Sequence, residues 1–356
     1  MIKLIHAADF HLDSAFSSLP PQFAAERRKE QRRALQELAA VCSDCDIVLL
    51  SGDLFDSGQI YRDTLDALRE CFASIHAQIF ISPGNHDFVA NGSPYMSENW
   101  GENVHIFKHP TIERVHLEEL NCDIYGAGFV SMEQGALLEN FRVLDENALN
   151  LMVIHGDLQP NSSYNPIRTE EIAATGLNYL ALGHVHSSMS ATAGRTTYAY
   201  PGCLMGRGFD ECGQKGVLKV CVDKQSCRVD FVPLKNRKYE ILSVEATDDA
   251  LAAIAAVLPP NCTEDCYRII LTGESDGIDV SSLENALRRN FFSLEIRDRT
   301  LPKQELWSAV TEDTLRGHFL RELKAQYDQS DEQDRLAIAR AAKLGLDLMD
   351  GREVQI

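Results

Sequence analysis

Short apolar segments alternate with helical patterns along the chain as far as about residue 235. Candidate strands include IKLIHAAD (2–9), DIVLLSGD (46–53) and QIFISPGNHD (78–87), and helical patterns cover residues 21–40 and 61–76. Strands that are apolar along their whole length and separated by helices indicate a sheet buried on both faces. The later strands follow one another through short connections, which suggests hairpins that close one side. The pattern therefore predicts a layered α/β sandwich.

The pattern changes near residue 237. Residues 238–300 have the pattern strand, helix, strand, helix, strand, without an obvious catalytic cluster. After Pro302, two segments carry apolar residues at helical spacing: Leu315, Phe319, Leu323 and Tyr327, then Ala337, Ala341, Leu344 and Leu348. A length of 356 residues also exceeds that of a usual single core. We therefore expect a large domain at 1–237, a small α/β domain at 238–302 and a helical segment at 303–356.

The composition favours a protein of the cytoplasm. No segment approaches the ~18 apolar residues that span a bilayer, so we expect no membrane association. The first residues, MIKLIHAADFHL, lack a small-residue cleavage site and indicate a strand rather than a signal peptide. Ten scattered cysteines without an export signal fit reduced thiols better than a disulfide framework.

The net charge bears on whether nucleic acid can be a partner. At −19 it argues against nucleic acid, because phosphate binding normally needs a basic face. Bound divalent cations would reverse the local sign at a site rich in carboxylates. The charge therefore does not exclude a nucleic-acid substrate.

Five of the candidate strands end in groups that can bind metal ions. These groups are Asp9 and His11; Asp53 and Asp56; Asn85, His86 and Asp87; His155 and Asp157; and His184 and His186. Ligands bind at this edge of α/β sheets. Turn chemistry explains one such cluster, because Asn, Gly and Asp are common turn residues, but it does not explain five in order.

The residue types are those of a site for two metal ions. Imidazole and carboxylate together suit Mn, Fe or Zn, and two ions ~3.5–4 Å apart can clamp a phosphate between them. One carboxylate would have to serve both ions. Glycines beside the ligands, such as Gly84, let backbone and substrate approach closely.

The ordered motifs resemble those of the calcineurin-like metallophosphoesterase superfamily: D-x-H, G-D-x-x-D, G-N-H-D, a lone His and G-H-x-H. The resemblance implies an α/β/β/α sandwich, here followed by a small α/β capping domain and C-terminal helices. It implies catalytic roles for His86, as proton donor or transition-state stabiliser at the departing oxygen, and Asp87, which orients the His86 ring. It also implies the metal ligands: Asp9, His11 and His186 for one ion; Asn85, His155 and His184 for the other; and Asp53 as the bridge.

Further segments are similar to the SbcD-type DNA repair exonucleases, within them the YhaO-like branch. These segments are HAADFHLDSAF (6–16), GDLFDSG (52–58), LALGHVHS (180–187) and YPGCLMGRGFDECGQKGVLKV (200–220). The similarity implies a DNA exonuclease or endonuclease of DNA repair that uses manganese, with a hydroxide between the two ions as the nucleophile. Asp56 stands where some relatives carry a histidine. Arg207 is a candidate phosphate ligand, because arginine suits bidentate phosphate recognition.

The same resemblance implies partners besides DNA. In SbcD-type relatives a C-terminal helical segment binds the coiled-coil root of an SMC-like ATPase, and residues 303–356 could do the same; a homodimer is also possible. Two alternatives to the nuclease stay open. One is a phosphodiesterase or phosphatase that acts on a small nucleotide, and the other is a DNA-binding subunit that mainly docks to an ATPase and has weak catalysis.

Overall fold

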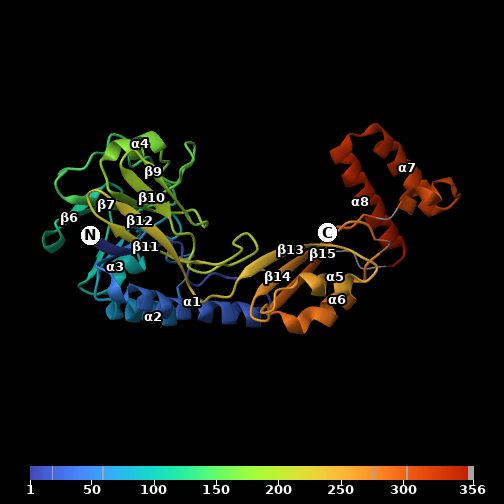
Figure 1. Cartoon of the computed structure of the whole chain (residues 1–356), viewed down its shortest axis with the longest axis horizontal. Helices are drawn as coiled ribbons and strands as arrows, with labels where there is room; N and C mark the ends of the chain where they lie inside the picture. The colour runs from blue at the N-terminus through green and yellow to red at the C-terminus, as the bar shows by residue number, and fades with distance from the viewer. Residues whose placement is uncertain (18, 58–59, 276, 302–303, 352–356) are drawn as a thin grey trace. The chain divides into compact units, whose positions relative to one another are not determined.

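The chain divides into two compact units, Met1–Lys238 and Tyr239–Ile356 (Figure 1). The structure, a computed structural model, describes residues 1–17, 19–57, 60–275, 277–301 and 304–351. The division between the units lies directly beside the expected boundary at 237/238. The second expected boundary, at 302/303, lies outside the described residues.

The first sheet of the large unit combines parallel and antiparallel strands. Its order is β12-β11-β1-β2-β3-β4. The parallel strands are β1 (Ile2–Ala7), β2 (Ile47–Leu50), β3 (Gln78–Ile81) and β4 (Val104–Ile106). The antiparallel hairpin of β11 (Gly216–Val222) and β12 (Cys227–Pro233) extends it beyond β1. Ala7 pairs with Leu50, and Leu50 with Ile81, so β1, β2 and β3 end side by side.

The second sheet also has a parallel centre. Its order is β5-β6-β7-β8-β10-β9. The central strands β6 (Cys122–Gly126), β7 (Leu149–His155), β8 (Tyr179–Gly183) and β10 (Thr196–Tyr200) are parallel. Antiparallel strands β5 (Glu113–Leu117) and β9 (Met189–Ala193) form its edges.

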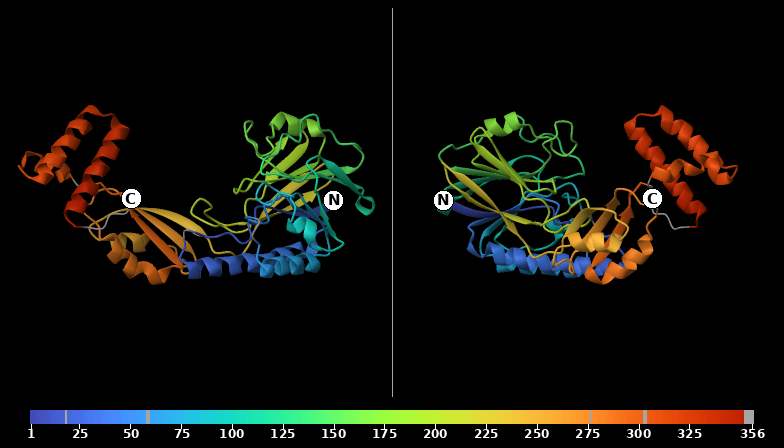
Figure 2. Two further views of the ribbon diagram at one scale, coloured as in Figure 1. Left: turned by 180° about the vertical axis from the view of Figure 1, so that it is seen from behind. Right: turned by 45° about the vertical axis from the view of Figure 1, so that its right-hand side comes forward.

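The central strands are buried on both faces, because four layers stack on one another. The helices α1 (Pro21–Val41) and α2 (Arg62–Ser74) run side by side against the first sheet (Figure 2), and their apolar faces share a core with β1, β2 and β3. The opposite face of these strands packs against β6, β7 and β8. Helix α4 (Thr169–Thr175) covers the outer face of the second sheet. The predicted α/β/β/α sandwich is confirmed. A short helix, α3 (Pro94–Ser97), follows β3.

The second unit begins with a small α/β layer. Its sheet has the order β13-β14-β15, with all three strands parallel: β13 (Tyr239–Glu245), β14 (Cys266–Thr272) and β15 (Ser293–Asp298). Helices α5 (Ala250–Val257) and α6 (Val280–Leu287) connect the strands. Ile254 and Leu287 from these helices pack with the apolar strand residues in one core.

The helical segment of this unit has a core of its own. It consists of the 3-10 helix η4 (Gln304–Thr311), α7 (Leu315–Gln329) and α8 (Glu332–Met349). Phe319, Leu323 and Tyr327 pack around Leu320 and Ala342, whereas Leu315 at the start of the same stripe is 77% exposed. Part of the apolar stripe predicted from the sequence is therefore already covered inside the segment. Among the described residues, no helix combines the length and apolar character needed to cross a bilayer.

Candidate metal centre

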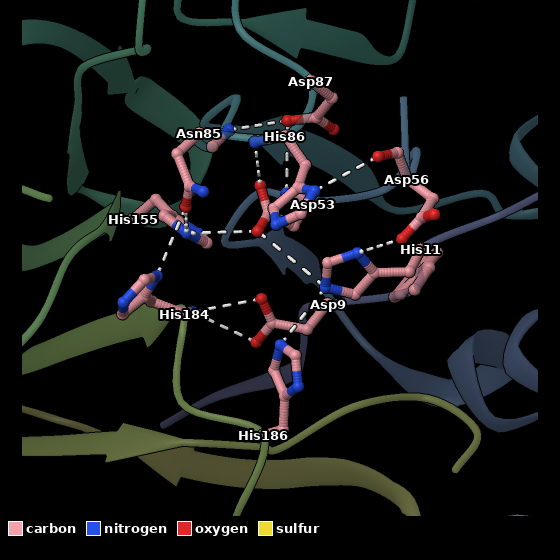
Figure 3. A network of polar contacts seen from close by, with 12 residues as sticks. Asp9, His11, Asp53, Asp56, Asn85, His86, Asp87, His155, His184 and His186 are labelled. Atoms are coloured by element: carbon pink, nitrogen blue, oxygen red, sulfur yellow. Dashed lines mark hydrogen bonds and ion pairs between the residues drawn. The ribbon is translucent and has the colours of Figure 1, made fainter. Parts of the chain in front are cut away.

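The polar strand ends of the two sheets converge on one site, shown in Figure 3. Asp9 and His11 follow β1, Asp53 follows β2 and Asn85 follows β3; His155 ends β7, and His184 and His186 follow β8. The structure thus brings together every residue predicted to bind metal. Ligand atoms of Asp9, His11 and His186 lie within 4.8 Å of one another, and so do those of Asp9, Asp53 and His155.

The backbone at this site is strained. Asp9, His11, Asp53 and His184 have φ angles of 53°, 44°, 52° and 105°. L-residues rarely adopt this left-handed region, and residues held there cluster at functional sites because the surrounding structure must enforce the strain. The turn after each strand therefore aims these side chains at the site at a cost in backbone energy.

Two glycines make room for the turns. A Cβ at Gly183 would overlap the carbonyl oxygen of Ser51, and one at Gly84 would collide with the carboxylate of Asp53 and lie 2.9 Å from the Asp53 backbone nitrogen. Only the missing side chain lets these backbones come so close. Gly84 therefore has the role that the sequence suggested for it.

His11 and His186 face each other with their basic nitrogens. The two Nε2 atoms are 3.2 Å apart. Nδ1 of His11 donates to Asp56 Oδ1 at 3.1 Å, and Nδ1 of His186 donates to Glu211 Oε1 at 2.7 Å. Burial lowers the pKa of His11 to about 4, so its ring is neutral near pH 7. When both rings are neutral, two lone pairs meet here with no proton between them, which is an arrangement that a cation stabilises.

A second contact of the same kind involves His155. Its Nδ1 donates to the carbonyl oxygen of Ser51 at 2.8 Å, so its Nε2 carries the lone pair. Burial lowers the pKa of His155 to about 4. That Nε2 faces two oxygen acceptors, Asn85 Oδ1 at 2.9 Å and Asp53 Oδ2 at 3.4 Å. Asn85 Oδ1 also lies 3.3 Å from Nδ1 of His184. Nε2 of His155, Oδ1 of Asn85 and Oδ2 of Asp53 are all acceptors, so none of the three supplies a proton to the others.

Two buried carboxylates lie between these contacts. Asp9 is 0% exposed and Asp53 is 1% exposed. Burial, and then the charge of Asp53, raise the pKa of Asp9 well above its ordinary value. The backbone N–H groups of His184 and His86 donate to Asp9 and Asp53 respectively. Carboxylates and neutral imidazoles in this arrangement form a donor set that fits divalent cations.

Asp87 does not have the predicted contact. We expected it to orient the ring of His86, but its carboxylate instead accepts from the backbone N–H groups of Gly84 and Leu54, both at 2.7 Å, and from the hydroxyl of Tyr95 at 2.5 Å. The ring of His86 is held through its Nδ1, which is 3.1 Å from the carbonyl oxygen of Asp56. Asp87 points back into the turns because their N–H groups need acceptors. This expectation was wrong.

Three side chains lie behind His11 and His186: Asp56 and Arg207, which the sequence had already singled out, and Glu211. Asp56 and Glu211 accept from these histidines, and Arg207 donates to both carboxylates, to Asp56 Oδ1 at 3.0 Å and to Glu211 Oε1 at 2.7 Å. Sequence analysis did not predict Glu211, although it lies in the segment 200–220 that also drew attention to Arg207. Direct contact of Arg207 with phosphate stays a prediction.

Comparison with known proteins identifies the family. The model of the calcineurin-like phosphoesterases matches residues 2–188, a range that contains every predicted ligand. An uncharacterized metallophosphoesterase, YhaO of Bacillus subtilis strain 168, is 30% identical over 266 residues, which cover 69% of this chain and 64% of the relative. The match thus spans less than two thirds of the relative's length.

Two solved structures give weaker matches. The protein TT1561 of Thermus thermophilus has a TM-score of 0.39 at 10% identity, covering 65% of this chain and 98% of its own. An archaeal phosphodiesterase has a TM-score of 0.34 at 12% identity, covering 65% of this chain and 100% of its own. Since the family model spans more than half of the sequence, the chain belongs to the calcineurin-like phosphoesterase family and is a metallophosphoesterase.

Proposed function

We propose that this metallophosphoesterase is a nuclease that hydrolyses phosphodiester bonds in DNA as part of DNA repair. The observation that best supports a phosphoester hydrolase is the pair of close contacts between potential ligand atoms, His11 Nε2–His186 Nε2 and His155 Nε2–Asn85 Oδ1, on either side of two buried carboxylates. The choice of DNA is supported by the similarity of residues 6–16, 52–58, 180–187 and 200–220 to SbcD-type exonucleases.

The proposed metal ligands follow from these contacts. Asp9, His11 and His186 would hold one ion; Asn85, His155 and His184 would hold the other; and Asp53 would contact both. Two divalent ions, manganese in our proposal, would neutralise charge on the phosphate and lower the pKa of water in the site. The side chains themselves contribute ligands that the fold holds in place. Ser51 and Asp56 hold the His155 and His11 tautomers that this role requires.

His86 is placed to handle the proton of the leaving group. Its backbone is fixed by Asp53, and its Nδ1 donates to the Asp56 carbonyl, so Nε2 is the nitrogen left for substrate. His86 is also exposed, which allows a bound polymer to reach it. In the proposed step an oxygen from water forms a bond to phosphorus, the P–O3′ bond breaks, and Nε2 of protonated His86 gives its proton to the departing 3′ oxygen.

A parallel substrate assay tests this proposal. The full chain with Mn²⁺ is offered end-labelled duplex DNA, single-stranded DNA, a 2′,3′-cyclic nucleotide and a chromogenic phosphodiester. We expect cleavage of DNA as well as of the chromogenic compound. The Asp53→Asn variant, purified in the same way, controls for contaminating nucleases. Hydrolysis of the cyclic nucleotide with DNA left intact would replace our proposal by a small-nucleotide phosphodiesterase.

We also propose that the helical segment binds an SMC-like ATPase. The proposal rests on the resemblance to SbcD-type relatives, and exposed apolar residues supply a surface: Leu315 (77%), Leu348 (60%), Leu336 and Met349 (both 41%). The double variant Leu315→Glu, Leu348→Glu should lose the co-expressed ATPase in a pull-down and keep full activity on the chromogenic ester. Met132→Glu, at an exposed apolar residue of the large unit, is the matched control. If wild type, the double variant and Met132→Glu all retained the ATPase equally well, this surface would not be the binding site.

A further inference from the structure

Arg207 binds two carboxylates, and each carboxylate orients one of the two histidines proposed to bind the same ion. The guanidinium of Arg207 donates to Asp56 Oδ1 at 3.0 Å and to Glu211 Oε1 at 2.7 Å, and the Arg207 backbone N–H donates to Glu211 Oε2 at 2.7 Å. The same oxygens, Asp56 Oδ1 and Glu211 Oε1, accept from Nδ1 of His11 and Nδ1 of His186. The guanidinium of Arg207 is therefore the common start of two hydrogen-bonded paths. One runs through Asp56 to His11, and the other runs through Glu211 to His186.

This arrangement is partly shielded from solvent, and its single cation faces two carboxylates. The side chains of Arg207, Asp56 and Glu211 are 22%, 27% and 3% exposed. Burial opposes the charge on Glu211, yet hydrogen bonds from His186 and Arg207 hold its pKa well below the ordinary value. Charged groups that pair in such surroundings fix each other's geometry more firmly than they would in water.

The histidines proposed to bind the other ion have different hydrogen-bond partners. The Nδ1 of His155 donates to a neutral backbone carbonyl, that of Ser51. Nε2 of His184 is 3.8 Å from the carboxylate of Asp157, beyond hydrogen-bond distance. The two halves of the site therefore differ: carboxylates held by an arginine support His11 and His186, and a carbonyl supports His155.

We infer that Arg207 is a positioning residue that, through Asp56 and Glu211, sets the affinity of the Asp9–His11–His186 half of the site for its ion. The inference rests on the proposed two-ion function and deepens it. A carboxylate behind a ligating histidine fixes the ring and raises its basicity, and loss of such a partner lowers metal affinity by roughly 10–100-fold. Removing the Arg207 side chain would take the guanidinium donor from both carboxylates at once, while the Asn85–His155–His184 half keeps its support.

The test is an equilibrium titration of the full, metal-free chain with Mn²⁺, followed by elemental analysis. Wild type should bind two ions. Arg207→Met should bind one of them about 10–100-fold more weakly and the other unchanged. Glu211→Gln keeps an acceptor for His186 and should lose less affinity than Glu211→Leu. Arg33→Met removes an exposed arginine that pairs with Glu26 and should match wild type.

Two further measurements assign the effect. Combining Arg207→Met with Asn85→Ala should abolish tight binding altogether, because the two changes act on different halves. The turnover of the chromogenic ester by Arg207→Met should rise from limiting to saturating Mn²⁺ by a larger factor than that of wild type, because concentration then compensates for the lost affinity. Urea unfolding with chelator present reports whether the fold itself has been weakened.

The outcomes separate the inference from the function on which it rests. If wild type binds no Mn²⁺, the proposed function fails. If wild type binds two ions and Arg207→Met binds both equally well, only the inference fails. Equal weakening of both ions together with a less stable chelated protein would make the arginine a general structural residue. A raised KM at unchanged metal affinity would make it a substrate contact, which also overturns the inference.

Discussion

The two units of the chain use similar elements but differ at the ends of their strands. Both contain parallel strands connected through helices. In the large unit, the non-glycine residues with positive φ include the proposed ligands Asp9, His11, Asp53 and His184, besides five residues outside the ligand set: Asp13, Phe16, Asn121, Asn140 and Asn165. Among the described residues of 239–351, positive φ angles occur only at glycines. Glycine adopts this region without strain, whereas a strained non-glycine residue must be stabilised by its surroundings. The comparison shows that parallel topology supplies an edge in both units, and that in the large unit four of the seven proposed ligands stand there in strained turns.

The two units also differ in how their buried charged groups are paired. In the large unit, Asp9, Asp53 and the histidine lone pairs leave an excess of acceptors. In the second unit, the buried Lys343 donates to Asp298 at 2.7 Å and to the hydroxyl of Thr300 at 2.6 Å, so its charge is paired. An excess of acceptors indicates a bound cation, and a complete pair indicates a structural role.

The largest expected effect is at Asp53. Asp53→Asn should reduce hydrolysis by more than the ~10–100-fold known for outer-shell groups, because it weakens the ligand proposed for both ions. Asparagine tolerates the φ of 52° at this position, so the backbone should be kept. Activity with the chromogenic ester and metal content by elemental analysis measure the change. Near-normal rates with two ions bound would exclude a bridging role for Asp53.

His86→Ala should come next. Turnover should fall by roughly 10²–10⁴-fold, the range for general acid–base groups, while bound metal stays at the wild-type level. The measurement is kcat together with metal content on the same preparation. A parallel loss of metal and activity would mean that His86 is a ligand, which would change the composition of the site in our comparison.

Gly84→Ala tests the close packing of the turns after the strands without removing a functional group. The added methyl would displace the Asp53 carboxylate, so kcat should fall by up to ~10²-fold, as expected for a misplacement of about 1 Å. Gly135→Ala is the matched control, since a Cβ there meets nothing within 4 Å. Equal activity of the two variants would show that close packing at Gly84 does not position Asp53.

Lys343→Met should have the smallest effect on catalysis. It leaves Asp298 without its cation, and we expect a loss of about 1–3 kcal/mol in the stability of the second unit. Hydrolysis of the chromogenic ester should stay within twofold of wild type. Urea unfolding and the ester assay measure the two quantities. A strong loss of hydrolysis would show that the polar cluster of the second unit serves the site, and the contrast between the units would fail.

Two features could be predicted from the sequence for a physical reason: the layered sandwich, and the common edge at which the strands end. Fully apolar strands between helices must be buried on both faces, and parallel strands in register end at a common edge. Polar residues placed directly after such strands therefore have little freedom to lie elsewhere. This reasoning brings Asp9, Asp53, Asn85 and His155 together; their roles as ligands stay predictions.

Contacts made by loops could not be predicted in the same way. Glu211 reaches His186 from a loop 25 residues further along the chain, and no periodicity fixes the path of that loop. Asp87 lies next to His86 in sequence, yet it turns toward the N–H groups of Gly84 and Leu54. Helical spacing predicted the stripe on α7, but not that Phe319 would be covered within the segment and Leu315 exposed. These features depend on tertiary packing, which local patterns do not specify.

The division of the proposed ligands between the two sheets has a thermodynamic consequence. Asp9, Asp53 and Asn85 follow strands of the first sheet, and His155 and His184 belong to the second. Ions bound by both groups would cross-link the layers, so metal affinity and sheet-to-sheet packing become linked equilibria. A chelator would then loosen the whole sandwich rather than one edge of it. Conversely, a large-to-small substitution that leaves a cavity between the two sheets, far from every proposed ligand, would lower the affinity for the ions.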